Sequence, residues 1–534
     1  ARGCEQAMGN DTLSERRGFL TLLATYLVTF VALRFLLSGT VGVDDVEQVL
    51  FAQGLYRVYN PSQPPLYTWM LWGLFEVFGP SLAVAVILRA ILWGLVFLFL
   101  YGSARRLLRD PRLALLAAFS PLLIFSIGWG AHQGFTHTAL LSAAVSASFY
   151  LMVRLMEDGV TSRSPRLVDY AALGLAMGVG FLAKFSFALF ALPLFAACLL
   201  QEPTRRHIFT PHILFTMGII ALMIVLPVLW MADAGESVQG VMARTMDSGE
   251  GAGGDAGGLM KRLGTVVSAP VLFLSPLWLL CLLFFPQAAY RRDTGARVNT
   301  PDIHRLLMHF FLIALLFLLL GIFFAGVGPL KARWMHPVLL LFPLFFFLRV
   351  EEVGVRAGQI RNYGWVLLCS VVLVAGFWIA QAQGGFALCK KCRLFEPYPE
   401  LASAIAVAGF TRGTIVAGDE HIGGNFRVAF PGSRVLTLRY PHFVPSPAQE
   451  IPALEVSDLK PGQCLVVWHV TGEGTPQALP PDLVSYLERR LGAFLEGGVG
   501  EEKVRLVSGE NGAARERTLR LGFLILPQGR GTCA

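Results

Sequence analysis

The chain has 534 residues, of which 54% are hydrophobic and only 15% are charged. A soluble domain carries about 25% charged residues, so this composition excludes an ordinary soluble protein and favours one that lies largely in lipid. The formal net charge of +8 does not indicate nucleic-acid binding, because the arginines form short clusters between apolar blocks and no continuous basic face.

The first apolar run covers residues 18–38 and follows Arg16 and Arg17. A helix of this run would be about 31 Å long, enough to cross the hydrocarbon core. Arg34, its single charge, is expected to snorkel towards the outer interface. The run is too long for a signal-peptide core and has no small-residue cleavage site after it. We therefore expect an uncleaved first span that follows a cytoplasmic segment, residues 1–17.

Ten further apolar blocks are candidate membrane spans by their length and hydropathy. These blocks are 82–102, 113–129, 134–153, 168–183, 186–200, 211–231, 264–286, 304–327, 334–349 and 363–382.

Arginine clusters occupy every second loop between these blocks, as expected for loops on the cytoplasmic side. The sequence therefore predicts a polytopic α-helical protein of the bacterial inner membrane, with about eleven transmembrane helices in residues 18–382. Its N-terminus would be cytoplasmic and its C-terminus periplasmic. The arginines of the predicted cytoplasmic loops are Arg105, Arg106, Arg109, Arg112, Arg154, Arg163, Arg166, Arg205, Arg206, Arg291, Arg292, Arg297, Arg349, Arg356 and Arg361.

Two long loops are predicted on the periplasmic side, 39–81 and 232–263. The second contains a glycine-rich run from Gly249 to Gly258 and is expected to be mobile. It would serve either as a flexible connector or as a lid over a site.

Residues 383–534 have the composition of a soluble protein. Strand-like runs at 413–418, 433–438, 463–470 and 518–526 alternate with helical patterns at 400–409 and 480–495, which predicts a periplasmic α/β domain. A supporting or acceptor-binding role is expected for it. Cys389 and Cys392 have C-x-x-C spacing, and a local disulfide is favoured over a metal site because no second ligand pair with zinc spacing follows.

Asp44 and Asp45 are adjacent carboxylates a few residues beyond the first span. Ionisable groups at a membrane boundary are costly unless they stay hydrated or serve a function. One of them could simply cap a helix over 45–57. The alternative is a functional carboxylate pair.

Cations at the outer ends of distant spans favour the functional interpretation, because few cations are expected on that side. Each could be a snorkelling residue, but together they could bind the oxygens of a phosphate. A carboxylate pair that faces such a cluster suits a general base on one substrate and a leaving phosphate on another. The residues at these outer span ends are Lys184, Lys331, Arg333, His336 and the His132 and His137 group.

Several short motifs occur in the order seen in one known family. They are Asp44-Asp45, Gln63-Pro64-Pro65-Leu66-Tyr67, Phe78-Gly79, Arg89, Phe135-Thr136-His137-Thr138 and Gly180-Phe181-Leu182-Ala183-Lys184. In this combination the chain resembles bacterial glycosyltransferase family 39, the relatives of protein mannosyltransferase and of the lipid A aminoarabinose transferase. The resemblance implies the glycosyltransferase-C fold, a sugar donor carried on a polyprenyl phosphate, and transfer on the periplasmic side.

Site residues follow from this resemblance position by position. Asp44 matches the catalytic carboxylate of the first loop, and Asp45 stands where many members have Glu. Lys184 and Arg333 match basic positions near the donor phosphate, which Lys331 and His336 could assist. Candidate substrate-binding residues are Gln63, Tyr67, His132 and His137.

Departures from the family pattern matter at two of these positions. Gln63 replaces a common Lys, and His137 replaces a common Asp, which weakens the case for a carboxylate-based metal site. No cofactor is required by the sequence, and a divalent metal is unsupported. The His132 and His137 pair is more often structural than metal-binding. One pattern of the C-terminal region is similar to a bacterial branch that includes lipopolysaccharide core galacturonic acid transferases. It consists of Cys389-x-x-Cys392-Arg393, Gly424-Asn425-Phe426-Arg427 and Phe430-Pro431.

The resulting hypothesis is an inverting glycosyltransferase whose Asp44 deprotonates an acceptor hydroxyl while cations hold the departing polyprenyl phosphate. The acceptor could be lipid A or other lipopolysaccharide, another glycan or a protein. Three alternatives remain: a lipid-linked glycan ligase or polymerase, a transporter or flippase, and a membrane scaffold for the C-terminal domain. Against a transporter, no internal repeat relates two halves of the chain.

Overall fold

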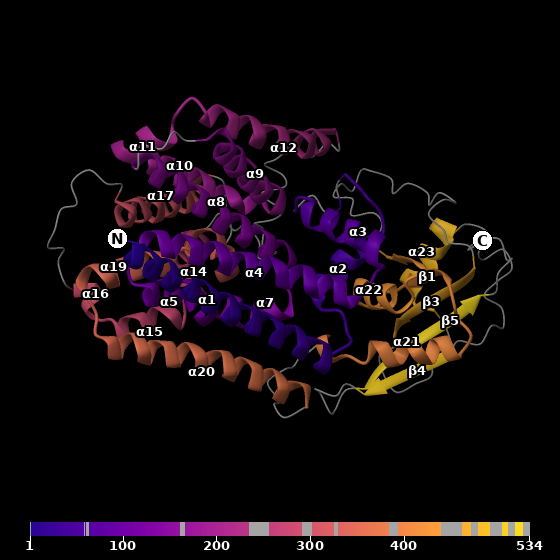
Figure 1. The fold of residues 1–534 in the computed structure, drawn as a ribbon. Helices are drawn as coiled ribbons and strands as arrows, with labels where there is room; N and C mark the ends of the chain where they lie inside the picture. Colours follow the sequence, from indigo (N-terminus) through magenta and orange to yellow (C-terminus); the bar gives the residue numbers. More distant parts are fainter. Residues whose placement is uncertain are drawn as a thin grey trace. The chain divides into compact units, whose positions relative to one another are not determined.

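The protein is seen in a computed structural model that describes residues 2–57, 59, 63–160, 166–233, 256–290, 302–324, 329–383, 393–438, 462–470, 479–491, 505–510 and 518–526. It is mostly helical (Figure 1). The chain divides into two compact units. We call Ala1–Phe30, Pro61–Leu66 and Arg89–Val374 the helical unit. Val31–Asn60, Tyr67–Leu88 and Ala375–Ala534 form the α/β unit.

The helical unit is built from α-helices joined by short connections. Its elements are α1 (Arg2–Leu37), α4 (Leu82–Leu107), α5 (Pro111–Phe119), η1 (Ser120–Leu123), α6 (Phe125–Gly128), α7 (Gly130–Gln133), α8 (Thr136–Val160), α9 (Leu167–Ala183), η2 (Phe185–Phe187), α10 (Ala188–Leu200), α11 (Glu202–Ile208), α12 (Ile213–Asp233), α14 (Ala256–Phe273), α15 (Leu277–Phe284), α16 (Gln287–Tyr290), α17 (Ile303–Phe324), η3 (Ala332–Met335), α18 (His336–Leu339), α19 (Phe342–Val353) and α20 (Ala357–Ala382). The ends of α1, α4 and α20 contribute to the α/β unit.

Among the described residues, five helices are long and apolar enough to cross a membrane. A sixth is possible if Ala332–Leu339 and Phe342–Val353, which meet at 53°, form one broken span. Pro343, the second residue of the second piece, explains the break, because it has no backbone N–H to continue the helix of the first piece. Shorter apolar helices occupy several other predicted blocks. The chain is therefore a multi-pass membrane protein, while the predicted count of eleven spans is not confirmed.

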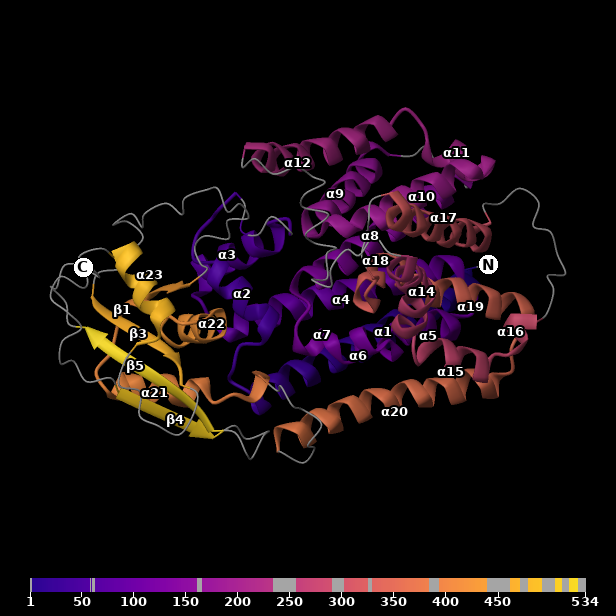
Figure 2. The same ribbon diagram turned by 180° about the vertical axis from the view of Figure 1, so that it is seen from behind.

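Apolar side chains on the long helices are exposed on their outer faces. Leu36 of α1, Phe324 of α17 and Leu373 of α20 are 81%, 84% and 70% exposed. Such large apolar surfaces are unfavourable in water, so these faces suit lipid. Inside the unit, α9 packs against α8 and α12, and both pairs can be followed in Figure 1 and Figure 2.

The α/β unit contains α2 (Val43–Phe51), α3 (Leu66–Phe78, whose first residue belongs to the helical unit) and a five-stranded sheet. The strand order is β2-β1-β3-β5-β4; β1 is parallel to β2 and β3, and β5 is antiparallel to β3 and β4. The strands are β1 (Gly413–Ala417), β2 (Arg434–Thr437), β3 (Gln463–His469), β4 (Arg505–Glu510) and β5 (Thr518–Leu526).

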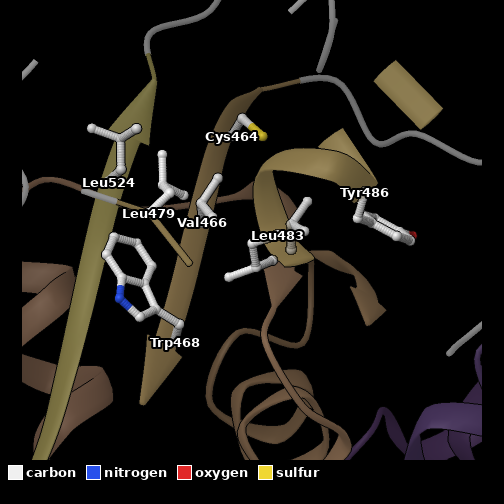
Figure 3. Packing of buried hydrophobic residues seen from close by; sticks show 8 residues of the cluster. Cys464, Val466, Trp468, Leu479, Leu483, Tyr486 and Leu524 are labelled. Carbon is white, nitrogen blue, oxygen red and sulfur yellow. The ribbon is translucent and has the colours of Figure 1, made fainter. Parts of the chain in front are cut away.

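Successive side chains of a strand point to opposite faces of the sheet, and apolar side chains on both faces must be covered. Helices cover both faces here. On one face, α23 (Pro481–Leu491) packs through Leu483 against Val466 and Trp468 (Figure 3). The opposite face is covered by α21 (Tyr398–Val407) and α22 (Glu420–Ala429), and η4 (Arg393–Phe395) precedes α21. Four strands coincide with the runs that the sequence predicts, whereas β4 and α22 do not follow from its pattern.

Two predicted features lie outside the described residues. One is the Cys389 and Cys392 pair, and the other is residues 234–255 of the glycine-rich loop. Cys464 is disulfide-bonded, which the sequence pattern does not predict.

Candidate functional site

Lys184 lies directly after the last residue of α9. Its Nζ is 3.4 Å from Oγ1 of Thr138, in the first turn of α8. Next to Thr138, His137 places Nδ1 3.2 Å from the carbonyl oxygen of Ala183. Since a carbonyl oxygen can only accept, Nδ1 carries the proton of this hydrogen bond. The end of α9 and the start of α8 thus bring Lys184 and His137 together.

His336, the first residue of α18, belongs to the same neighbourhood. It is fully buried. The positive charge of Lys184 is close enough to interact electrostatically with the imidazoles of both His336 and His137. Three aromatic rings surround it: its ring centroid lies 5.0 Å from Phe273, 5.8 Å from Phe135 and 6.4 Å from Trp93. Neither ring nitrogen of His336 has a hydrogen-bond partner among the described residues. A buried imidazole with two unused nitrogens suits a polar ligand.

Backbone strain marks the turn into α8. Phe135 has φ of 66°, in the left-handed region that a bulky residue rarely adopts. Such strain costs about 1–3 kcal/mol and often occurs at ligand sites. Here the strained residue directly precedes Thr136 and His137 and contacts His336.

Lys331 and Arg333 lie on the segment that leads into His336. The Lys331 Nζ is 5.6 Å from the centre of the Trp334 ring, within cation–π range. Arg333 is exposed on η3. This segment is held by α14, because the backbone N–H of Leu330 donates to Oγ1 of Thr265 at 2.9 Å. Their predicted role at the donor phosphate stays a prediction.

His132 has the contacts of a structural residue. Its Nε2 lies 2.8 Å from the hydroxyl oxygen of Tyr26, and its ring stacks on Phe30 at 3.9 Å. Both partners belong to α1. These contacts favour a role in packing over the predicted role in substrate binding. Gln63 is half-buried in the helical unit.

The carboxylates Asp44 and Asp45 lie in the first turn of α2, in the α/β unit. Asp44 is exposed, whereas Asp45 is only 1% exposed. The capping interpretation is wrong in detail, because the helix spans Val43–Phe51 and its cap is Gly42. Carboxylates in a first turn still interact favourably with the helix dipole.

Tyr67 and Arg34 are both buried in the same unit. Tyr67 is fully buried on α3, and its neighbour Thr68 donates its hydroxyl to Oε1 of Gln48 on α2 at 2.6 Å. The expected snorkelling of Arg34 is wrong. Its side chain is 2% exposed and donates to the carbonyl oxygens of Ser38 and Thr40.

The two sets of residues offer complementary chemistry. Lys184 with two imidazoles suits an anionic group, and Asp44 is an exposed carboxylate that can accept a proton. No group of three or more His, Cys, Asp or Glu side chains in the described part of the chain is placed to hold a metal ion. Sequence reasoning missed Trp93, since no local pattern marks a residue that acts only as a neighbour. It named Phe135 and Thr138 as parts of a motif and gave them no role at the site.

Comparison with known proteins defines the class of this membrane protein. Residues 62–231 match the family described as dolichyl-phosphate-mannose-protein mannosyltransferase. The chain belongs to this glycosyltransferase-C family of membrane glycosyltransferases, as the sequence resemblance predicts. It is a glycosyltransferase, and the transporter and scaffold alternatives lose their support.

Two relatives extend over nearly the whole chain. Lipopolysaccharide core galacturonosyltransferase RgtB of Rhizobium johnstonii is 30% identical over 490 residues, which cover 90% of this chain and 93% of the relative. Lipopolysaccharide core galacturonosyltransferase RgtA of the same organism is 29% identical over 505 residues, 91% of this chain and 92% of the relative.

The fold is shared with a solved structure. ArnT from Cupriavidus metallidurans, bound to undecaprenyl phosphate, matches 95% of this chain and 98% of its own length. The TM-score is 0.59 at 13% sequence identity, so the likeness concerns the fold alone.

Proposed function

We propose that this protein transfers galacturonic acid from a polyprenyl-phosphate donor to the core of lipopolysaccharide at the periplasmic face of the inner membrane. One observation carries the proposal: two lipopolysaccharide core galacturonosyltransferases match this chain almost end to end. A lipid-linked donor is supported by the undecaprenyl phosphate bound to ArnT, which shares the fold.

In the proposed reaction, the carboxylate of Asp44 accepts the proton of an acceptor hydroxyl. The hydroxyl oxygen then attacks the anomeric carbon of the donor sugar, and the bond from that carbon to the phosphate oxygen breaks. Polyprenyl phosphate leaves with the bonding electron pair. Attack opposite the leaving group inverts the anomeric configuration.

The leaving phosphate needs no general acid if cations stabilise its charge. Lys184 is the first candidate, because its ammonium group is held at the start of α8 beside two imidazoles. Arg333 on η3 and Lys331, the residue before η3, would add positive charge. His336 would offer the phosphate or the sugar its two ring nitrogens, which have no hydrogen-bond partner in the described part of the chain.

The membrane topology is part of the proposal. Eleven spans with a cytoplasmic N-terminus would place loop 39–81, loop 232–263 and residues 383–534 in the periplasm, as the arginine clusters indicate. The disulfide of Cys464 supports this location of the C-terminal region, because disulfides persist in oxidising compartments such as the periplasm.

Mass spectrometry of lipopolysaccharide from cells with and without the gene tests the proposal. We expect the core to lose one or more uronic acid residues without the gene, and wild-type chain, but not the Asp44→Asn variant, to restore them. The purified enzyme should use polyprenyl-phosphate galacturonic acid and not a nucleotide-linked galacturonic acid. An unchanged core, or the loss of a different sugar, would contradict the proposed donor and acceptor.

A further inference from the structure

The helix that carries Asp44 and Asp45 packs closely on a helix of the C-terminal region. In the α/β unit, α2 lies against α22, side by side in Figure 1 and Figure 2. A Cβ atom on Gly424 would lie 2.8 Å from Cγ1 and 2.9 Å from the carbonyl oxygen of Val46. These separations are too short for any side chain, so glycine at position 424 sets how closely the helices approach.

The neighbouring glycine extends this contact along α2. A Cβ atom on Gly423 would lie 3.3 Å from Cδ2 of Leu50, one turn beyond Val46. Val46 and Leu50 are 2% and 0% exposed. Their spacing of four residues puts both on one face of α2, and this face is buried.

Hydrogen bonds fix the segment that leads into α2. The hydroxyl of Ser38 donates to the carbonyl oxygen of Leu394, and that of Thr40 donates to the carbonyl oxygen of Glu396. Closest to the helix, the backbone N–H of Val41 donates to Oδ1 of Asn425 at 2.7 Å.

Asn425 is itself fixed. Its side-chain Nδ2 donates to the carbonyl oxygen of His421 at 2.9 Å, and the residue is 5% exposed. Both ends of its amide are therefore used, one within α22 and one towards the first loop. Because both groups of the amide are bonded, the Asn425 side chain is held in the orientation that binds the N–H of Val41.

The segment after α2 is fixed at the edge of the sheet. β2 is an edge strand, so the backbone groups of Val435 that point away from β1 need partners. Gln53 supplies both: its Nε2 donates to the Val435 carbonyl oxygen at 3.0 Å, and its Oε1 accepts from the Val435 N–H at 2.8 Å. The side-chain amide thus replaces a neighbouring strand.

The need for such support follows from the length of α2. It has nine residues, and isolated helices shorter than about 12 residues are marginal in water. Its orientation is therefore set by tertiary contacts, and the contacts above are made before, along and after it.

We propose that residues 393–438, together with the sheet they join, form a positioning platform for the first-loop carboxylates, and that Gly424, Asn425 and Gln53 are positioning residues for Asp44. The platform acts through α2: it fixes the helix axis, and this sets where the Asp44 carboxylate is presented. The effect on catalysis rests on the proposed function, in which Asp44 is the base. The docking of α2 does not depend on it.

Hydrogen–deuterium exchange on the full chain in lipid nanodiscs tests the docking. Gly424→Ala should speed exchange in residues 43–51 by about tenfold or more, because α2 loses its packing surface. Exchange in β1 and β3 should stay slow. Gly432→Ala is the matched control, since a Cβ atom there would meet no heavy atom of a non-neighbouring described residue within 4 Å. Unchanged exchange of α2 in Gly424→Ala would overturn the docking.

Transfer kinetics test the positioning. A catalytic group displaced by about 1 Å can cost on the order of 10²-fold in rate, so Gly424→Ala and Asn425→Leu should lower kcat by about that factor. The KM for the donor should not change, since α2 is not assigned to the phosphate. Loosened exchange of α2 with a normal kcat would overturn the positioning role.

Milder variants keep the test valid if Gly424→Ala fails to fold. Asn425→Asp retains the acceptor for Val41, so it should recover part of the kcat that Asn425→Leu loses. Gln53→Glu keeps the acceptor for the Val435 N–H but loses the donor, and should loosen residues 43–51 with intact β1 and β3. Equal kcat for Asn425→Asp and Asn425→Leu would contradict the proposed contact.

Failure of the proposed function has a different signature. If Asp44→Asn retains normal turnover, Asp44 is not the base. A lower kcat in the platform variants would then not report the position of the Asp44 carboxylate. The exchange of residues 43–51 still decides the docking, because it needs no substrate.

Discussion

The carboxylate of Asp419 lies 3.0 Å from Nε2 of His469. Asp419 follows β1 after one residue, and His469 ends β3, so the pair joins the carboxyl ends of two adjacent parallel strands. Asp419 also caps α22 by accepting the backbone N–H of Ile422 at 2.8 Å. The hydroxyl oxygen of Tyr398 lies 3.3 Å from the same His469 nitrogen. This cluster therefore links the sheet to the two helices on one of its faces.

The pKa of Asp419 makes the stability of the α/β unit depend on pH. Burial raises this pKa, but His469, the Ile422 N–H and His421 together outweigh burial and hold it below its ordinary value. A lowered carboxyl pKa stabilises the folded state above the unfolded pKa of about 4. This stabilisation is lost as the pH falls through the folded pKa.

Asp419→Asn isolates the charge, because Asn is also a good helix cap. We expect the wild-type chain to unfold at a higher temperature than Asp419→Asn near neutral pH, and the difference to shrink below about pH 4. Asp419→Ala should lose about 1 kcal/mol more through the cap. Thermal unfolding of the full-length wild type and variants, from neutral pH to below about pH 4, measures these differences in stability. A constant difference down to about pH 3 would show that the charge contributes nothing.

Asp44 should be required for turnover and not for donor binding. General base catalysis contributes about 10²–10⁴-fold, so Asp44→Asn should lower kcat by a factor in this range. The dissociation constant for polyprenyl phosphate should be unchanged. Asp45→Asn is the neighbouring comparison: Asp45 is buried, so its variant should affect stability more than Asp44→Asn does. Turnover by Asp44→Asn near the wild-type rate would disprove the base assignment.

Lys184 should hold the phosphate of the donor. Hydrogen bonds to charged groups contribute about 1.5–3 kcal/mol, so Lys184→Ala should weaken binding of polyprenyl phosphate by about 10- to 100-fold. Lys184→Arg keeps the charge and should lose less. Thr138→Val removes the hydroxyl near Nζ and should have a smaller effect than Lys184→Ala. Fluorescence titration with a labelled polyprenyl phosphate gives these constants, and equal affinity in Lys184→Ala would refute the assignment.

Tyr26→Phe separates the two roles considered for His132. It removes the hydroxyl that lies 2.8 Å from Nε2 of His132 and leaves the ring in place. If His132 is structural, the variant should lower thermal stability by about 1 kcal/mol, a typical net value for one hydrogen bond. KM values for donor and acceptor should then match the wild type. A raised KM with unchanged stability would instead support a role for His132 in substrate binding.

The sequence by itself determined the class of protein. Hydropathy and loop charge are local properties, so the apolar blocks predict a multi-pass membrane protein without any knowledge of packing. The sequence similarly predicts β1, β2, β3 and β5, since each is a short strand-like run between turns. Motifs in a fixed order, from Asp44 to Lys184, gave the family. β4 was missed because its run Arg505–Glu510 is polar at several positions.

Only the tertiary structure decided which distant segments support each other. Val41 and Asn425 are 384 positions apart, and nothing local marks them as partners. The sequence predicts the first loop as a periplasmic loop that carries the carboxylates, but it does not show that α2 of this loop packs on α22 in the α/β unit. Arg34 has the pattern of a snorkelling residue, but its guanidinium turns back onto the carbonyl oxygens of the loop. Packing depends on complementary shape and on pairing of buried polar groups, and these are properties of two surfaces together.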